Sequence, residues 1–454
     1  MKILAEFSPR WMLLLFWLAQ SVSVDADDLS TYVVEDVIEV AEVVSEFRVR
    51  FCLLTEGKKQ YVAYYDKKRK MTVASRDLES SKWEYQILPS SIGWDSHNYI
   101  TMAVDTEGNL HVSGNMHADP LVYFRTVKPG DISTLKSFPM IGEQENRTTY
   151  PNFLKNEGGK LVFNYRDGGS GRGKRIYNEY DVESRTWSRM LKKALLDGEG
   201  ERNAYPSGPK KGPDDWYHMI WVWRDTPDCA TNHHLSYAKS RDLKNWQSAF
   251  GDEVKLPLTL GQEKLWVDPV PPGGGMINGG AKLSFDSKKR PLISYHKADE
   301  AGNMQIYAAR PMAEGWERKR LTNWAKPIEF SGFGSMGNIG IQVSRLEQVK
   351  ESLLVMSFQH RDYGRGRLFI DETTLKPSDI KMKIPKELPD ELSKMDSDFR
   401  GMLKQRAGDS GNSEDSSVRY MLQWESLGSN HDKPRKGLLP EPSVLKLYKL
   451  RLRK

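Results

Sequence analysis

The chain has 454 residues, of which 38% are hydrophobic and 28% charged, and its formal net charge is +6. This length is sufficient for a large hydrophobic core and would accommodate two or three domains of ordinary size. Acidic and basic residues alternate throughout, so the composition excludes a nucleic-acid-binding tail and a polybasic lipid-binding patch. We therefore expect a globular protein without a nucleic acid partner.

The first 26 residues have the pattern of a secretory signal peptide. Lys2 and Arg10 supply positive charge, residues 11–24 form an apolar core, and small or polar residues follow. An uncleaved anchor is the alternative, but the apolar part is short for a membrane span. The pattern predicts a secreted or periplasmic mature chain, residues 27–454, that has no membrane partner after signal removal.

Similar units of about 45 residues recur along the rest of the chain. Each unit begins with an apolar strand, turns through Asp, Gly or Asn, and continues with a strand rich in Tyr, Trp or Val. Six units can be delimited directly: 59–88, 97–138, 150–190, 204–247, 280–322 and 339–377. A seventh can be assembled from C-terminal strands at 420–424 and 445–450 and an N-terminal contribution from 38–54.

Repeated sheets of about four strands are typical of the blades of a β-propeller, and a ring closed by both termini leaves no exposed edge. The repeats therefore predict an all-β fold, a single seven-bladed β-propeller closed by strands from both ends of the chain. Two packed β-sandwiches are the alternative. Three irregular stretches, 197–213, 251–280 and 378–417, are interpreted as loop insertions on the propeller faces, the last with a short helix over 390–404.

The stretch from Asp95 to His117 is predicted to form a β-hairpin. Its two alternating runs, HNYITMAV and NLHVSGNM, are joined by a polar turn at 105–109. His97 and His117 stand at the open end of this hairpin, where the start of one strand and the end of the next are neighbours. The two imidazoles are therefore expected to lie side by side at one rim of the sheet.

The next unit carries Tyr150 and Arg166 at the positions that His97 and His117 occupy in theirs. A shared position in adjacent blades places all four groups at the mouth of the ring. Two histidines, a tyrosine and an arginine suit acid–base chemistry on an anionic substrate. The alternative is structural, with Tyr150 packing before Pro151 and Arg166 forming a surface pair.

Several segments resemble one family. GWDSHNYITMAVDTEGNLHVSGNMHADPLVYFR, TYPNFLKNEGGKLVFNYRDGGSGRGK, NHHLSYAKSRD and GGAKLSFDSKKRPLISYHKADEAGNMQIYAAR are similar to the BNR-repeat-4 family, which contains the seven-bladed ulvan lyases and resembles related rhamnosyl-glucuronate-cleaving enzymes. The resemblance runs from about residue 38 to about residue 450. It implies cleavage beside a uronic acid by β-elimination.

The resemblance also implies an active site made of His97, His117, Tyr150 and Arg166. Tyr150 or His97 would abstract the C5 proton, the same groups would protonate the departing oxygen, and Arg166 with a histidine would neutralise the carboxylate. A tyrosine base requires a lowered pKa, for which Arg166 is the candidate cation.

Further polar residues are candidates for substrate binding. Lys282 and His296 interrupt apolar strands, where an unpaired charge is costly. They either line the central channel and bind sulfate or carboxylate, or pair with Asp286 or Asp299 and brace the blade. The full set of candidates is Asn98, Arg172, Lys282, His296, Gln305 and Arg310.

Cys229 and His233 form a C-x3-H pair that is a candidate metal site. The family resemblance permits a structural zinc or calcium ion here, whereas the chemistry itself requires no cofactor. The alternative is a packed thiol and a histidine bonded to a loop carbonyl. Cys52 and Cys229 are the two cysteines, and export permits a disulfide between them without requiring one.

The leading hypothesis is a monomeric exported lyase for a uronate-containing, rhamnose-rich polysaccharide or oligosaccharide. A hydrolase for rhamnosyl-glucuronate linkages is the second, but hydrolysis usually needs a pair of carboxylates and none is evident near His97. A non-catalytic glycan-binding propeller is the third, since it would keep a basic channel without needing the His/Tyr/Arg set.

Overall fold

The computed structural model describes residues 30–411 and 413–453, so the predicted signal peptide lies outside the described residues. In this part of the chain no helix is long and apolar enough to cross a membrane. Helix is confined there to single 3-10 turns: η2 (Ile132–Thr134), η3 (Cys229–Thr231), η4 (Glu263–Leu265) and η5 (Asp390–Ser393). The fold is all-β, as predicted.

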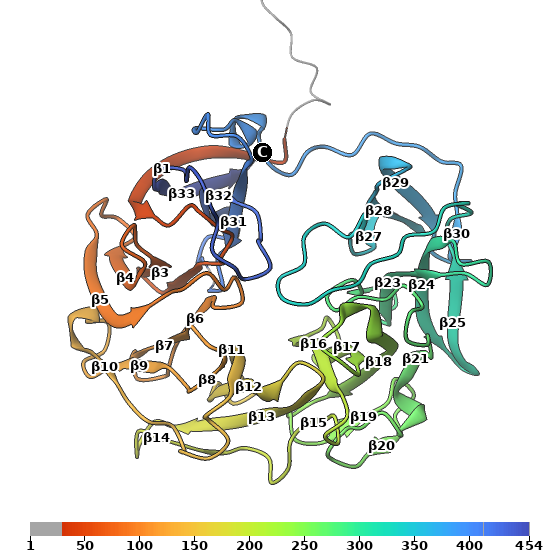
Figure 1. The fold of residues 1–454 in the computed structure, drawn as a ribbon, viewed down its shortest axis with the longest axis horizontal. Coiled ribbons are helices and arrows are strands. Elements are labelled where there is room, and N and C mark those ends of the chain that lie inside the picture. Colours follow the sequence, from red (N-terminus) through yellow and green to blue (C-terminus); the bar gives the residue numbers. More distant parts are fainter. Residues whose placement is uncertain (1–29, 412, 454) are drawn as a thin grey trace, which may run out of the picture.

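The strands of the described ranges form seven antiparallel sheets, which follow one another around a ring (Figure 1). Sheet 1 contains β2 (Cys52–Glu56), β3 (Lys59–Tyr65), β4 (Lys70–Asp77) and β5 (Glu84–Ser91). Sheet 2 contains β6 (Ile100–Val104), β7 (Leu110–Gly114), β9 (Tyr123–Thr126) and β10 (Leu135–Ser137). Sheet 3 contains β8 (His117–Asp119), β11 (Thr148–Lys155), β12 (Leu161–Gly169), β13 (Arg172–Asp181), β14 (Thr186–Arg189) and β15 (Leu196–Asp197).

The other four sheets continue the ring. Sheet 4 contains β16 (Asn203–Lys211), β17 (Tyr217–Arg224), β18 (Asn232–Ser240), β19 (Trp246–Gln247), β20 (Glu253–Val254) and β21 (Trp266–Asp268). Sheet 5 contains β22 (Lys282–Phe285), β23 (Pro291–Ala298), β24 (Met304–Met312) and β25 (Gly315–Arg320). Sheet 6 contains β26 (Ile341–Val343), β27 (Glu347–Lys350), β28 (Leu353–His360), β29 (Gly364–Asp371) and β30 (Lys376–Pro377). Sheet 7 contains β31 (Met402–Gly408), β32 (Val418–Leu427), β33 (Ser443–Leu452) and β1 (Tyr32–Val43).

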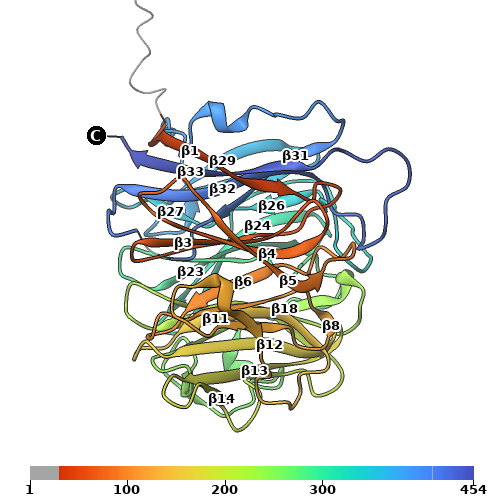
Figure 2. The same ribbon diagram turned by 90° about the vertical axis from the view of Figure 1, so that its left-hand side faces the viewer.

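Sheet 7 joins the two ends of the chain. Strand β1 pairs with β33 along its length, from Tyr32 opposite Leu452 to Val43 opposite Ser443. Figure 2 shows the two strands side by side at one end of the molecule. The predicted propeller closed by both termini is therefore confirmed, and the alternative of two sandwiches is wrong. The N-terminal contribution predicted at 38–54 is divided, because β1 enters sheet 7 and β2 enters sheet 1.

The core lies between the sheets, which explains why many strands are apolar on both faces. All eight residues of β17 are buried, including Trp221 and Trp223. A strand covered by a neighbouring sheet on each side has no solvent face, so polar alternation disappears. Full burial of one large apolar side chain contributes roughly 1.5–3 kcal/mol, so each interface between sheets is a substantial source of stability.

The predicted insertions are only partly irregular. Strand β16 lies within 197–213, β20 and β21 within 251–280, and β31 within 378–417. The helix predicted over 390–404 is wrong: η5 is a single turn, and β31 begins at Met402. Between them, the backbone N–H groups of Asp396 and Ser397 donate to the carboxylate of Glu425 at 2.7 and 2.9 Å, which replaces the bonds that a helix would make.

Candidate active site

The hairpin predicted around the two histidines is present but shorter than expected. Strands β6 and β7 pair from Ile100 opposite Gly114 to Val104 opposite Leu110. The turn is held by Asp105 Oδ1, which accepts hydrogen bonds from the backbone N–H groups of Glu107 and Asn109 at 3.0 and 2.8 Å. His97 precedes β6 in chain order and His117 follows β7, so neither belongs to the paired strands.

His117 departs from its predicted place because it begins β8, which belongs to sheet 3. The chain leaves sheet 2 through Asn115, whose φ is 63°, and Ala118 has the same φ. Left-handed backbone at two non-glycine residues redirects the chain sharply. The imidazoles of His97 and His117 still lie together, with ring centroids 4.2 Å apart.

Thr149 of β11 connects the next two site residues. It pairs with His117 on one side and with Arg166 of β12 on the other. Its Oγ1 accepts hydrogen bonds from Arg166 Nη2 at 2.9 Å and from the backbone N–H of Ala118 at 2.8 Å. The row His117–Thr149–Arg166 therefore crosses three strands of sheet 3 and fixes the spacing of the His117 and Arg166 side chains.

Tyr150 lies in a bulge beside this row. The pairing of β11 with β12 shifts between Thr149 and Asn152, and Tyr150 has a φ of 57°. Left-handed backbone at a non-glycine residue costs on the order of 1–3 kcal/mol, and such strain clusters at functional sites. The bulge brings the phenol ring to 6.0 Å from His97 and 6.5 Å from His117, measured between ring centroids.

The two histidines share one carboxylate. His97 Nδ1 lies 2.8 Å from Asp95 Oδ1, and His117 Nδ1 lies 2.5 Å from Asp95 Oδ2. A second carboxylate, that of Asp432, lies 3.3 Å from His97 Nδ1 through its Oδ2. The Nδ1 atoms of both rings are therefore engaged by carboxylates, and of the two histidines His97 lines the neighbouring pocket.

These contacts control the charge of His97. Burial alone would lower the pKa of His97, but the hydrogen bonds and negative charges of Asp432 and Asp95 outweigh it and raise the pKa to about 9. For Asp95, burial favours the neutral acid, yet its hydrogen bonds to His117 and His97 lower the pKa below the ordinary value. At neutral pH His97 is therefore an imidazolium, and the Asp95 carboxylate that holds it is ionised.

Tyr150 has the opposite balance. Burial is the largest influence and, with the nearby Tyr205, raises the pKa of the Tyr150 phenol well above 10, although Arg166 and Arg224 act to lower it. The guanidinium of Arg166 lies 5.0 Å from the centre of the Tyr150 ring. The expected effect of Arg166 on Tyr150 is present in direction, but burial exceeds it and the phenol keeps its proton at neutral pH.

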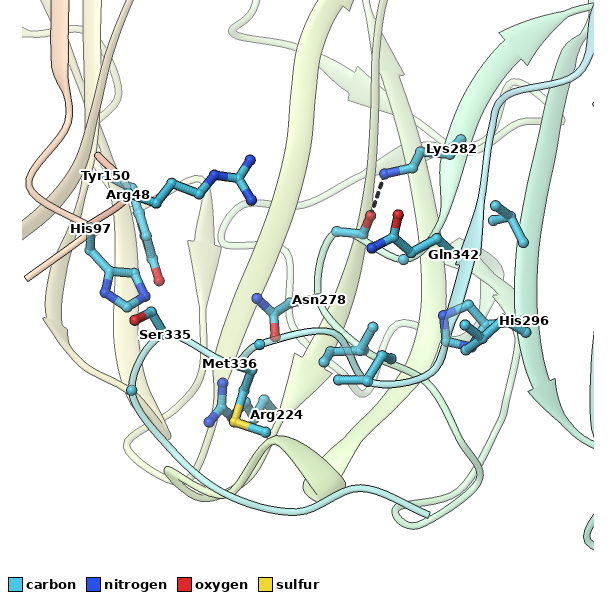
Figure 3. Close-up of a pocket in the computed structure, with 18 residues that line it drawn as sticks. Arg48, His97, Tyr150, Arg224, Asn278, Lys282, His296, Ser335, Met336 and Gln342 are labelled. Atoms are coloured by element: carbon cyan, nitrogen blue, oxygen red, sulfur yellow. Dashed lines mark hydrogen bonds between the residues drawn. The ribbon is translucent and has the colours of Figure 1, made fainter. Parts of the chain in front are cut away.

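A pocket of about 550 Å³ opens in front of His97 and Tyr150. Figure 3 shows His97, Tyr150 and Arg48 on one wall and Lys282, Gln342 and His296 on the opposite wall. Its other lining residues are Arg224, Ile277, Asn278, Gly279, Gly280, Gly334, Ser335, Met336, Gly337, Ile339, Ile341 and Val343. Among the described residues, this lining contains no Asp or Glu and includes three Lys or Arg side chains.

Two of the predicted substrate-binding residues, Lys282 and His296, line this pocket. Lys282 Nζ donates to the carbonyl of Gly279 at 2.6 Å, and burial, with the nearby Arg345, lowers its pKa. His296 Nδ1 lies 2.9 Å from the carbonyl of Gly275, and burial lowers the pKa of this histidine to about 4. Neither residue pairs with Asp286 or Asp299, so the channel-lining alternative describes their position.

The other four candidates lie outside the pocket lining. Gln305 is buried and bonds through Nε2 to Asp299 Oδ2 at 2.8 Å, which is the bracing alternative. Arg310 is buried with Glu317 as its partner, at 2.8 Å. Asn98 bonds to Asn115 Oδ1 beneath the hairpin, and Arg172 is exposed at the start of β13.

Replacing Arg310 with methionine is expected to destabilise the fold without altering the pocket. Besides Glu317, Arg310 donates to the carbonyls of Glu372 and Thr373 at 2.5 and 2.6 Å, so it ties sheet 5 to sheet 6. Loss of a buried charged donor leaves these partners unpaired, and we expect about 3 kcal/mol less unfolding free energy in urea. Arg320→Met is the control, because it removes a half-exposed partner of Asp299 from the same sheet. This variant should change the unfolding free energy by less than about 1 kcal/mol.

The predicted metal site at Cys229 and His233 has other partners. His233 bonds through Nε2 to Asp225 at 2.9 Å, and its Nδ1 lies 2.7 Å from that of His234. Cys229 is a buried free thiol, as Cys52 is a partly exposed one. The one group of three or more His, Cys, Asp or Glu side chains in residues 30–411 and 413–453 close enough to share a metal ion is the cluster of Asp95, His97, His117 and Asp432. We assign that cluster to hydrogen bonding, since each Nδ1 is already matched to a carboxylate oxygen.

Several site residues were missed from the sequence. Asp95 precedes His97 by two positions, and the motif DSHN could have indicated it. Arg48 and Arg224 stand at the ends of strand patterns without a distinguishing signal. Asp432 comes from the loop between β32 and β33, 335 positions after His97, and no spacing relates the two.

Comparisons with known proteins agree with this architecture. The model of the BNR repeat-containing family (BNR_4) matches residues 59–324. No curated protein matches the sequence. Among solved structures, the polysaccharide lyase Uly1 has a TM-score of 0.59 at 13% identity, covering 92% of this chain and 100% of its own.

The PL25 ulvan lyase is also similar in structure. Its complex with -[GlcA(1-4)Rha3S]- has a TM-score of 0.56 at 13% identity, covering 91% of this chain and 94% of its own, and another structure of this lyase has 0.55 at 14% identity, with 91% and 95% covered. At such identities the likeness shows the fold, not the activity. Since the family model spans more than half of the chain, from sheet 1 through sheet 5, this protein belongs to the BNR repeat-containing family.

Proposed function

We propose that this protein is a polysaccharide lyase that cleaves a uronate-containing, ulvan-like polymer by β-elimination. The observation that carries the proposal is the pocket itself: His97 and Tyr150 line it together with three Lys or Arg side chains, and no Asp or Glu of the described residues belongs to the lining. Such a pocket attracts an anionic sugar and provides acid–base groups beside it. The structural neighbours Uly1 and the PL25 ulvan lyase are polysaccharide lyases of the same fold, which supports the class of reaction.

The hydrolase alternative needs reconsideration, because two carboxylates do lie near His97, contrary to the prediction. Asp95 and Asp432 both contact the Nδ1 side of the histidine. Burial would raise their pKa values, but the hydrogen bonds to histidine outweigh it and lower the pKa of both. A hydrolase requires one carboxylic acid with a raised pKa facing the glycosidic oxygen. These carboxylates are ionised and lie behind the imidazoles, so they favour elimination.

The charges suggest a division of labour among the site residues. The imidazolium of His97 would neutralise the uronate carboxylate, which makes the C5 proton acidic enough to be removed. His117, which Asp95 holds through its Nδ1 beside the ring of His97, is the candidate base. Tyr150 keeps its proton and would deliver it to the departing oxygen, with Arg166 stabilising the phenolate that forms.

In balanced form, His117 takes the C5 proton, the C4–O bond breaks as the C4=C5 double bond forms, and Tyr150 protonates the leaving oxygen. This assignment departs from the expectation that Tyr150 or His97 acts as base. The reason is that His97 is held as a cation up to pH about 9 and Tyr150 as a neutral phenol. Cationic side chains supply the charge neutralisation, so the proposed chemistry requires no metal.

The size of a polymeric substrate is consistent with the export that residues 1–26 predict, since a polysaccharide is degraded outside the cytoplasm. Secretion or periplasmic location, like the monomeric state, stays a prediction. The bound oligosaccharide belongs to the PL25 ulvan lyase. For this chain we infer only the same chemical class, a polymer whose uronate carboxylate and neighbouring anions meet Arg48, Arg224 and Lys282.

The decisive experiment is product analysis on a panel of uronate polymers that includes ulvan. Elimination creates an unsaturated uronate, so ultraviolet absorbance is expected to rise in step with new reducing ends. Reducing ends without that absorbance would identify a hydrolase. Binding of a polymer without either signal would identify a glycan-binding propeller, and each of these two outcomes would overturn the proposal.

A further inference from the structure

The carboxylate of Asp432 joins three parts of the ring. Its Oδ1 accepts hydrogen bonds from the backbone N–H and the hydroxyl of Ser96, both at 3.2 Å. Its Oδ2 accepts from the backbone N–H of Ser335 at 2.9 Å and lies 3.3 Å from His97 Nδ1. Ser96 and His97 lead into sheet 2, Ser335 lies in the segment that leads to sheet 6, and Asp432 itself belongs to a loop of sheet 7.

The backbone of this loop is strained where it presents the carboxylate. His431 and Asp432 have φ values of 51° and 60°, two consecutive non-glycine residues in the left-handed region. Such a conformation persists only where its surroundings hold it. Arg435 does so by donating to the carbonyls of Glu46 at 2.9 Å and Gly428 at 2.7 Å. Strain maintained by specific contacts points to a role for the side chain that it orients.

The join between sheets 6 and 7 differs from the other joins of the ring. In the described residues, buried hydrophobic clusters connect all the remaining pairs of neighbouring sheets. Here sheet 6 and sheet 7 have separate clusters, which take up Ile384 and Leu392 respectively from the connection between β30 and β31. Figure 1 shows that connection passing along the outside of the ring from one sheet to the other.

On the pocket side, the same join is bridged by Asp432 and its neighbour. His431 Nδ1 lies 3.3 Å from the carbonyl of Phe333, and Asp432 holds Ser335. Phe333 and Ser335 belong to the segment of residues 331–337, which contributes Gly334, Ser335, Met336 and Gly337 to the pocket lining. One carboxylate therefore contacts both the imidazole of His97 and the segment that lines the pocket beside it.

We propose that Asp432 is a positioning residue, which fixes the imidazole of His97 and ties residues 331–337 to it across the join between sheets 6 and 7. The inference rests on the proposed function, because it gives His97 a part in turnover. The charged and titratable groups around His97 are Asp95 from its own segment, His117 from β8, Tyr150 from β11 and Asp432. Asp95 is shared with His117, whereas Asp432 contacts His97 alone of the two histidines.

The test compares the full-length protein with Asp432→Asn, Asp432→Glu and the control Asp415→Asn. Asp415 carries a carboxylate on another loop of sheet 7, where it pairs with Arg451 at the surface. The first readout is the pKa of His97 by NMR of histidines labelled at Cε1, assigned with His97→Gln. Removal of an opposite charge in contact should lower that pKa by about one unit or more in Asp432→Asn, and Asp432→Glu should recover part of the shift. Asp415→Asn should leave it unchanged.

The second readout is the rate of elimination against pH. In Asp432→Asn, kcat/KM should fall about 10- to 100-fold, because a misplaced catalytic group costs rate without loss of fold, and its alkaline limb should move to lower pH. A folded Asp432→Asn with the wild-type His97 pKa and the wild-type alkaline limb would overturn the proposal. If the unmodified protein shows no lyase activity, the proposed function fails, but the NMR titration still decides whether Asp432 controls His97. If Asp432→Asn does not fold, a neutral His97 in the unmodified protein at pH 8 would overturn it instead.

Discussion

Replacing Tyr150 with phenylalanine is expected to lower kcat by about 10²- to 10⁴-fold while the protein remains folded. The change removes one hydroxyl group and keeps the ring, which packs against Tyr205 with centroids 6.2 Å apart and under the guanidinium of Arg166. Because burial keeps the phenol protonated, its loss removes the group that would protonate the departing oxygen. The measurement is the initial rate of unsaturated uronate formation, with thermal unfolding recorded on the same samples.

Tyr217→Phe is the matched control for this variant. Tyr217 lies in β17, and its hydroxyl donates to the carbonyl of Lys155 at 3.0 Å, away from the pocket. Loss of one hydrogen bond should cost about 1 kcal/mol of stability and leave kcat unchanged. A folded Tyr150→Phe protein with full activity would remove Tyr150 from the catalytic set and, with it, the proposed proton donor.

The ring could be predicted from the sequence because its repeat unit carries local information. Each sheet begins with an apolar strand followed by an Asp/Gly/Asn turn, and these features depend on neighbouring residues alone. The same is true of the β6–β7 hairpin. Strand position within a unit then placed Tyr150 and Arg166 near the histidines, since residues at equal positions in adjacent sheets meet at one end of a propeller. For His117 the structure reaches this arrangement in another way, because β8 joins the sheet of Arg166 and Thr149 pairs with both residues.

The residues that sequence reasoning misplaced are those whose surroundings come from another sheet. Gln305 and Arg310 are polar residues within the buried strand β24, a pattern shared with His296 in β23. Only the packing of sheets 5 and 6 decides that Arg310 binds the carbonyls of Glu372 and Thr373 rather than a ligand. Periodicity cannot separate a channel-lining side chain from one that bridges two sheets.

Asp432 is the extreme case of the same limitation. Its position depends on the turn geometry of a long loop and on closure of the whole ring, and neither leaves a local pattern in the sequence. Asp95 was closer to detection because it adjoins His97. The charge state of His97 depends on both carboxylates. The groups proposed to be catalytic could therefore be named from the sequence, whereas the protonation of His97 and Tyr150, on which their proposed roles depend, required the structure.

Replacing His97 with glutamine is expected to lower kcat by about 10³-fold and to remove a pH-dependent part of the stability. Glutamine can still donate to Asp95 but carries no charge, so the uronate carboxylate is no longer neutralised. The pKa of His97 in the folded protein is about 9, raised from an ordinary value of 6.5. A raised pKa contributes stability that is fully present below pH about 6.5 and is lost as the pH rises through about 9.

That contribution is on the order of 3 kcal/mol, given 1.36 kcal/mol for each pKa unit. Urea unfolding of the unmodified protein should therefore show a free energy that falls between pH 6.5 and pH 9, and the fall should be smaller in His97→Gln by about this amount. Tyr150→Phe provides the comparison, because it should lose turnover yet keep the wild-type slope. Equal slopes in the unmodified protein and His97→Gln would show that His97 is not an imidazolium in the folded state. Elimination would then need another cation beside the uronate, and Arg48, Arg224 and Lys282 are the Lys and Arg residues of the pocket lining.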